Sequence, residues 1–156
     1  MKPARVLFLC IGNSCRSPMA EGFARAYGSD VLTAESAGLA PALAISPLTH
    51  LVMHEKNIDL GHLFPRRVDA LKGHFDLVVN ISGSDVPHTL NAPVEEWEIL
   101  DPIGQSEEVF RQVRDEIEQR VMRLVLMMRN RKPAKSEGPA ATAPAWVDRH
   151  AHPPRK

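Results

Sequence analysis

The sequence has no long hydrophobic run and no excess of charge of either sign. The apolar stretch at residues 6–9 is far too short to cross a bilayer or to form the hydrophobic part of an export signal. Lysine and arginine together number 19, as do aspartate and glutamate, so no net charge draws the chain to nucleic acid or to a membrane surface. We therefore expect a cytoplasmic protein that binds neither nucleic acid nor membranes.

Cysteine is scarce as well, since the 156 residues include only Cys10 and Cys15. Thiols stay reduced in the cytoplasm, and a disulfide between these two positions would close too short a loop to stabilise the fold much. The two cysteines therefore predict reactivity rather than a structural cross-link.

Signatures of cofactor and metal sites are also missing. The chain contains neither Gly-x-Gly-x-x-Gly nor Gly-x-x-x-x-Gly-Lys-Ser/Thr, which argues against nucleotide binding through loops of those kinds. His50 and His54 are four residues apart, as two metal ligands on a helix can be, but no third ligand accompanies them. We expect no metal and no cofactor.

The sequence does contain an alternation of short apolar runs and amphipathic segments. The runs predict strands at residues 5–9, 31–35, 75–81 and 97–100. Caps and apolar periodicity predict helices at residues 17–27, 46–57 and from the cap Ser106 onward, with Ser17 as the cap of the first. Strands that alternate with helices predict an α/β fold, in which a parallel sheet carries helices on both faces.

The composition changes after residue 131. Residues 132–156 contain five prolines and six alanines but almost no large apolar side chains. Such a segment cannot bury enough apolar surface to order itself. We therefore expect a catalytic domain over residues 1–131 and a disordered tail over residues 132–156.

The predicted chemistry lies in residues 10–18, Cys-Ile-Gly-Asn-Ser-Cys-Arg-Ser-Pro, between the first strand and the first helix. A loop that leads into a helix presents unpaired backbone N–H groups and the positive end of the helix dipole. Gly12 permits unusual backbone angles, Asn13 tolerates the left-handed region, and the guanidinium of Arg16 can hold two oxygens at once. The expected ligands of a phosphate-like oxyanion are Ile11, Gly12, Asn13, Ser14, Cys15 and Arg16.

Cys10 stands at the end of the first predicted strand, beneath this loop. The field that binds an anion also favours a thiolate, and Ser17 can donate a hydrogen bond to it. A thiolate that faces a bound phosphorus atom is arranged for covalent phosphoryl transfer. Asp101 follows the fourth predicted strand and should reach the same edge of the sheet, where its carboxyl can protonate a leaving group.

The stretch from Cys10 to Glu21 resembles the active-site signature of the low-molecular-weight protein tyrosine phosphatases, and arsenate reductases of the same fold carry a similar one. Further matches, within residues 4–131, are Ser36-Ala37-Gly38, Gly61-His62, Phe75-Asp76 and Asp101-Pro102. The resemblance implies a four-stranded parallel sheet flanked by helices, no metal and no organic cofactor. It implies that Cys10 is the nucleophile, Arg16 the phosphate clamp and Asp101 the general acid. It also implies a supporting network of Asn13, Ser17, Ser36 and His62, and a redox role for Cys15 as the partner of Cys10.

The chain departs from both branches of this family. The phosphatases usually carry aromatic residues after the Asp-Pro pair, where this sequence has Ile103 and Gly104, and the loop 39–44 has no aromatic residue either. The thioredoxin-coupled reductases use two further cysteines beyond the third strand, and residues 80–92 contain none. Pro18 matches the phosphatases better, because the reductases commonly have glutamine there.

We therefore expect a phosphomonoester hydrolase, similar to the protein tyrosine phosphatases, that acts through a cysteinyl-phosphate intermediate. Its substrate would be a phosphorylated protein or a small phosphate or arsenate species. One alternative is an arsenate reductase that uses an external thiol donor. Another, from outside enzymology, is an inactive phosphate-binding module with a regulatory role.

Overall fold

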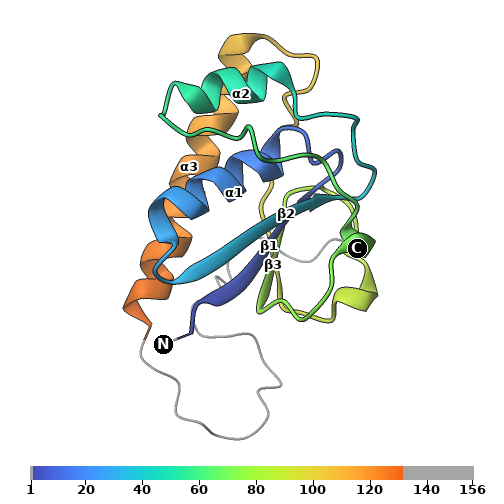
Figure 1. The fold of residues 1–156 in the computed structure, drawn as a ribbon, viewed down its shortest axis with the longest axis vertical. Coiled ribbons are helices and arrows are strands. Elements are labelled where there is room, and N and C mark those ends of the chain that lie inside the picture. Colours follow the sequence, from blue (N-terminus) through green and yellow to red (C-terminus); the bar gives the residue numbers. More distant parts are fainter. Residues whose placement is uncertain (1, 132–156) are drawn as a thin grey trace, which may run out of the picture.

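The computed structural model describes residues 2–131 (Figure 1). The predicted tail at residues 132–156 lies outside this described part. None of the helices within residues 2–131 is long and apolar enough to cross a membrane.

A four-stranded parallel sheet lies at the centre of the fold, as predicted. Its strands are β1 (Ala4–Cys10), β2 (Leu32–Gly38), β3 (Leu77–Asn80) and β4 (Val94–Glu96), in the order β2-β1-β3-β4. Strand β1 is apolar along most of its length because it lies between two strands and is covered on both faces. Since the strands are parallel, their carboxyl ends meet at one edge of the sheet.

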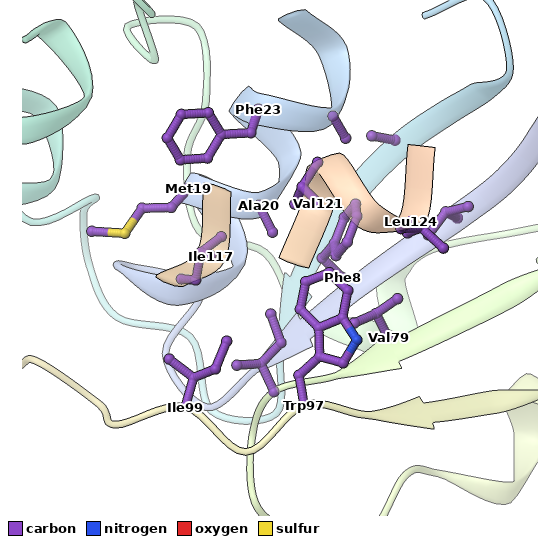
Figure 2. Packing of buried hydrophobic residues seen from close by; sticks show 14 of the residues in the cluster. Phe8, Met19, Ala20, Phe23, Val79, Trp97, Ile99, Ile117, Val121 and Leu124 are labelled. Atoms are coloured by element: carbon purple, nitrogen blue, oxygen red, sulfur yellow. The ribbon is translucent and has the colours of Figure 1, made fainter. Parts of the chain in front are cut away.

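The α-helices gather on one side of the sheet. They are α1 (Arg16–Gly28), α2 (Pro47–His54) and α3 (Glu107–Asn130). Figure 2 shows apolar side chains of α1 and α3 packed together over the sheet; those labelled on the helices are Met19, Ala20, Phe23, Ile117, Val121 and Leu124. They belong to the same cluster as Phe8 of β1, Val79 of β3 and Trp97, which follows β4. This packing fixes the start of α1 beside the carboxyl end of β1.

The other face of the sheet carries a second apolar cluster. Leu7 and Leu9 of β1 pack there with Val78 of β3. The covering segments are the 3₁₀ helices η1 (Val68–Ala70) and η2 (His88–Leu90) with their adjoining loops. The sheet is thus flanked on both faces, by α-helices on one and by these shorter helices on the other.

Several predicted element boundaries are wrong. Strand β2 runs to Gly38 rather than to residue 35, and β3 is Leu77–Asn80 rather than 75–81. The fourth strand is Val94–Glu96 rather than 97–100, because Trp97 and Ile99 are apolar for packing into the core and not for pairing in the sheet. Helix α1 begins at Arg16, so Ser17 lies inside the helix and does not cap it. Helix α2 ends at His54 instead of near residue 57. The predicted cap Ser106 is correct, since its Oγ accepts a hydrogen bond from the amide of Val109 at 3.3 Å.

Candidate active site

The loop between β1 and α1 curls at the carboxyl edge of the sheet. Its carbonyl groups are held from outside: Ile11 O accepts from the amide of Ala40 at 2.8 Å, and Gly12 O accepts from the amide of Ala42 at 2.9 Å. Within residues 2–131, the amides of residues 12–15 donate to no protein acceptor. These N–H groups are therefore available to an anion, which is the arrangement of an anion-binding nest.

The left-handed residue of this loop is Asn13, with φ 49°, as the sequence indicated. Gly12, which permits unusual backbone angles, is not among the residues with positive φ. Asn13 keeps this conformation because its side chain is bonded at both ends. Its Oδ1 accepts from the backbone amide of Arg66 at 3.0 Å, and its Nδ2 donates to Ser17 Oγ at 2.9 Å and to Ser36 Oγ at 3.0 Å.

Arg16 is buried and anchored by two backbone carbonyls. Its Nη1 donates to Ile81 O at 2.7 Å and to Ile99 O at 3.0 Å, which lie just beyond β3 and β4. Both hydrogens of Nη1 are thereby used. Among the described residues, Nε and Nη2 form no hydrogen bond, although Nη2 lies 3.5 Å from Asp101 Oδ2, so both can serve a ligand. The guanidinium can therefore clamp an oxyanion without having to be ordered first.

Cys10 ends β1 and is 2 % exposed. Its Sγ lies 2.9 Å from Ser17 Oγ. The hydroxyl predicted to cap α1 is turned toward the sulfur instead, because position 17 lies in the first turn of the helix, directly above the strand end. The structure thus brings Cys10, Ser17 and the amides of the loop into one site.

Asp101 lies on the opposite wall of this site. Its Oδ2 is 3.5 Å from Arg16 Nη2, its side chain is 46 % exposed, and its Oδ1 accepts from the amide of Ile103 at 3.2 Å. A partly exposed carboxyl beside the clamp can exchange protons with both solvent and a bound ligand.

Cys15, which directly precedes α1, is also buried. Burial raises the pKa of its thiol above the ordinary value, although hydrogen bonds with Thr49 and Ser14 act in the opposite direction. Desolvation disfavours the charged form of a group, so the thiol of Cys15 is protonated near neutral pH. Both cysteines are free thiols in the structure.

His62, expected in the supporting network, is placed at its outer end. Its Nε2 lies 3.2 Å from Arg25 Nη1 in an exposed position. Among the described residues it forms no hydrogen bond with Asn13, Ser17 or Ser36. Its contact with the network is therefore indirect, through Arg25, which pairs with Glu21.

Sequence reasoning missed two charged residues that do reach the network, Glu21 and Arg25. Glu21 is fully buried, accepts a hydrogen bond from Ser36 Oγ at 2.6 Å, and forms an ion pair with Arg25 at 2.6 Å. The signal was available in the sequence, because Ser17, Glu21 and Arg25 are spaced by four residues and so share one face of a helix.

The walls above the loop carry no aromatic ring at the expected positions. Ile103 is exposed, Gly104 has φ 76°, and Leu43 of the loop 39–44 is fully exposed. Trp97 is buried against Phe8, with ring centroids 5.9 Å apart, and so does not face the site. The arrangement can hold a tetrahedral oxyanion over a nucleophilic sulfur, with a proton donor beside it.

Comparison with known proteins places this geometry in a family. Residues 5–134 match the family described as low molecular weight phosphotyrosine protein phosphatase. A glutaredoxin arsenate reductase of Synechocystis sp. is 35 % identical over 126 residues, which cover 78 % of this chain and 95 % of that protein.

Similar solved structures include arsenate reductases and an arginine phosphatase. An arsenate reductase in the phosphate-binding state has a TM-score of 0.72 and 34 % identity, covering 80 % of this chain and 98 % of the other. The YwlE arginine phosphatase from Geobacillus stearothermophilus has a TM-score of 0.68 and 26 % identity, covering 81 % and 94 %.

Proposed function

The chain belongs to the low-molecular-weight phosphotyrosine protein phosphatase family, and on this premise we propose that it is an arsenate reductase whose electrons come from external thiols. The observation that carries the proposal is the 35 % identity with a glutaredoxin arsenate reductase over 95 % of that protein's length. The phosphatase activity expected from the sequence receives weaker support, because the similar arginine phosphatase structure is only 26 % identical.

The site suits a small tetrahedral anion. Arsenate and phosphate share the same shape and carry similar charge, so the amides of residues 12–15 and the guanidinium of Arg16 can serve either. The walls at Ile103, Gly104 and residues 39–44 offer no aromatic faces to hold a phenyl ring. A substrate without an aromatic ring does not need such faces for binding.

In the proposed first step, the sulfur of Cys10 attacks the arsenic atom of bound arsenate. A sulfur–arsenic bond forms and one arsenic–oxygen bond breaks, and the departing oxygen leaves as water after taking up protons. Asp101, whose carboxyl lies 3.5 Å from Arg16 Nη2, is placed to supply one of them.

In the second step an external thiol attacks the sulfur of Cys10. A disulfide bond forms, the sulfur–arsenic bond breaks, and its electron pair stays on arsenic, which leaves as arsenite. A second external thiol then attacks the mixed disulfide and releases Cys10 as a thiolate. In total, one arsenate and two thiols give one arsenite, one disulfide and one water.

Two features favour an external thiol over a thiol of this chain. The sequence has no cysteine besides Cys10 and Cys15, so no relay beyond β3 exists. Burial raises the pKa of Cys15, and a protonated thiol is a poor nucleophile toward sulfur. A small thiol such as glutathione, or a glutaredoxin, is the matching class of donor.

Phosphomonoester hydrolysis is the second candidate, favoured by the place of Asp101. A carboxyl beside the clamp can protonate the alcohol that leaves phosphorus, and can then activate water against the cysteinyl-phosphate. The same sulfur, loop and clamp would serve this reaction. The two activities differ only in what resolves the covalent intermediate, water or a thiol.

The test supplies purified protein with arsenate and glutathione, with and without a glutaredoxin, and in parallel with an aryl phosphate. We expect arsenite to form with two thiols oxidised per arsenite, Cys10→Ser to form none, and Cys15→Ser to retain turnover. Arsenite production that needs Cys10 supports the proposal.

Three other results would contradict it. Aryl phosphate turnover without arsenite would assign the protein as a phosphatase. Phosphate binding without arsenate reduction and without aryl phosphate hydrolysis would assign the protein as an inactive binding module. Arsenite that disappears in Cys15→Ser would make Cys15 the resolving thiol.

A further inference from the structure

A buried asparagine ends strand β3, which is otherwise apolar. Asn80 is 1 % exposed and follows Leu77, Val78 and Val79 in the strand. Asparagine is depleted in strands, and positions as buried as this one usually carry apolar residues. The side chain of Asn80 therefore needs an explanation beyond packing of the sheet.

Two backbone groups fix the orientation of the Asn80 amide. The carbonyl oxygen of Ser84 can only accept a hydrogen bond, so the atom that faces it at 2.8 Å is Nδ2. The backbone N–H of Ser82 can only donate, so the atom that faces it at 3.1 Å is Oδ1. The second hydrogen of Nδ2 goes to the carboxyl group of Glu96 at 3.0 Å. Both polar atoms of this side chain are thus bonded.

The bond to Ser82 holds a peptide group that also serves Arg16. The amide nitrogen of Ser82 and the carbonyl group of Ile81 belong to one planar peptide, in which N–H and C=O point in opposite directions. Asn80 Oδ1 accepts from the N–H side, and the oxygen on the other side accepts from Arg16 Nη1 at 2.7 Å. Asn80 and Arg16 therefore hold the same peptide from opposite sides.

This peptide group lies just beyond the end of the strand pairing. The hydrogen bonds between β3 and β1 reach as far as the N–H of Ile81, which donates to Leu9 O at 2.7 Å. The next N–H along the chain is that of Ser82, and it is the one that Asn80 binds. The side chain of Asn80 thus supplies, for this peptide, the bond that the sheet no longer supplies.

We propose that Asn80 is a positioning residue that orients the carbonyl of Ile81 and thereby holds the guanidinium of Arg16 open for an oxyanion. The proposal rests on Arg16 being the oxyanion clamp of the proposed function, but on no particular substrate. The side chain of Asn80 has its bonds at the ends of β3 and β4 rather than with the loop amides. It therefore acts through the peptide that follows Ile81.

The two carbonyl anchors keep Arg16 apart from Asp101. Arg16 Nη2 is 3.5 Å from Asp101 Oδ2, which is longer than the roughly 2.7–3.2 Å of an ordinary N–H···O hydrogen bond. With the carbonyl of Ile81 turned away, Ile99 O would be the carbonyl anchor left for Nη1. The guanidinium would then be free to pair with the carboxylate, and such a pair competes with a bound anion. Loss of the Asn80 amide should therefore weaken oxyanion binding.

The experiment measures the affinity of the full chain for inorganic phosphate by titration calorimetry. Asn80→Leu keeps the shape of the side chain and removes both of its polar atoms. A hydrogen bond to a charged group is worth about a tenfold change in affinity, so Asn80→Leu should weaken phosphate binding about tenfold.

Val79→Ala is the matched control. Val79 is the neighbouring residue of β3, is 0 % exposed and packs in the core. Its truncation loosens the same strand but leaves the bond between Asn80 and Ser82 in place. Phosphate affinity should equal that of the unchanged protein, although the melting temperature should fall as it does in Asn80→Leu.

An exchanged pair tests the route. In Asn80→Asp combined with Glu96→Gln, the carboxylate at position 80 accepts from the N–H of Ser82 and from the amide at position 96, and the total charge is unchanged. This variant keeps the acceptor that orients the peptide, although it gives up the bond to Ser84 O. It should therefore bind phosphate more tightly than Asn80→Leu does.

An NMR measurement follows Arg16 directly. Carbonyl groups on both hydrogens of Nη1 restrict rotation of this group, so the two hydrogens should give separate signals in the ligand-free protein, assigned by their absence in Arg16→Met. Asn80→Leu should merge or broaden these signals, and Val79→Ala should leave them unchanged. Because the measurement needs neither phosphate nor arsenate, it stays decisive if the proposed function fails.

The proposal is overturned by unchanged phosphate affinity in folded Asn80→Leu, or by unchanged Arg16 signals. It is also overturned if Val79→Ala loses as much affinity, which would indicate general loosening of β3. Asn80→Ala, with the same expected results, takes the place of Asn80→Leu if that variant does not fold. If the unchanged protein binds no phosphate, the proposed function fails, and the Arg16 signals then decide this proposal.

Discussion

Asp101 and Arg16 face each other across the mouth of the site, with Oδ2 of the carboxylate 3.5 Å from Nη2 of the guanidinium. They come from different segments, since Asp101 lies in the loop after β4 and Arg16 is the first residue of α1. The contact brings a carboxyl group to the edge of the proposed anion clamp, where the proposed reaction needs a proton donor.

Asp101→Asn should slow turnover according to the leaving group. Substrates whose leaving oxygen needs a proton should lose about 10²–10⁴-fold in rate, whereas an activated aryl phosphate should lose far less. Steady-state rates on both kinds of substrate make the comparison. An equal loss on the two would remove Asp101 from the role of acid.

Cys10→Ser should abolish turnover but keep oxyanion binding. The amides of residues 12–15 and Arg16, with its carbonyl anchors Ile81 and Ile99, are untouched by this change. Titration calorimetry with inorganic phosphate measures the binding, and Arg16→Met serves as the control that should lose it. Turnover that survives in Cys10→Ser would mean that another group is the nucleophile.

Mild peroxide should inactivate the protein reversibly through a Cys10–Cys15 disulfide. Both cysteines are free thiols flanking one short loop, and Cys10 is the one placed for thiolate chemistry. Mass spectrometry after oxidation, with Cys15→Ser as control, identifies the product. Irreversible sulfinic acid on Cys10 with Cys15 still reduced would contradict the prediction.

Glu55 should contribute stability that disappears in acid. The hydrogen bonds from Arg111 lower the pKa of Glu55 to about 2, with Arg114 adding to the effect, and they tie α2 to α3. Because the folded pKa is the lower one, this stability is present above the ordinary value of 4.5 and fades as the pH falls toward about 2.

Urea unfolding of the unchanged protein and of Glu55→Gln measures this effect. The difference in unfolding free energy between the two should be largest at neutral pH and should shrink below pH 4.5. A difference that stays constant down to about pH 2, the folded pKa of Glu55, would show that ionisation of Glu55 is not involved.

Ile103→Tyr should raise the preference for aryl substrates. A ring packed against another aromatic face gains about 0.5–1.5 kcal/mol, which corresponds to roughly three- to tenfold in kcat/KM. Gly104 is unsuitable for the same change, because its φ of 76° strains any residue with a Cβ. The measurement compares an aryl phosphate with an alkyl phosphate, and Ile103→Leu is the control. An unchanged ratio of the two kcat/KM values would show that the leaving group does not lie against residue 103.

The sequence predicted the elements whose cause is local. The cap Ser106 and the apolar face of α3 are correct because a cap and a period of 3.6 residues act within a few turns. The end of β1 at Cys10 and the left-handed Asn13 are correct for the same reason. Trp97 was misassigned to a strand because an apolar run looks alike whether it pairs in a sheet or packs beneath one.

The linear motif of residues 10–18 by itself determined that an oxyanion loop, a sulfur and a guanidinium stand together, since these groups are neighbours along the chain. Tertiary structure alone decided which way the hydroxyl of Ser17 points. That direction depends on the amide group of Asn13, which the backbone N–H of Arg66 orients. Arg66 lies beside the loop only because its segment is bonded to Gly38 at the end of β2, which pairs with β1. Hydrogen bonds act over about 3 Å, so partners that are distant in sequence can be identified only once the fold has brought them together.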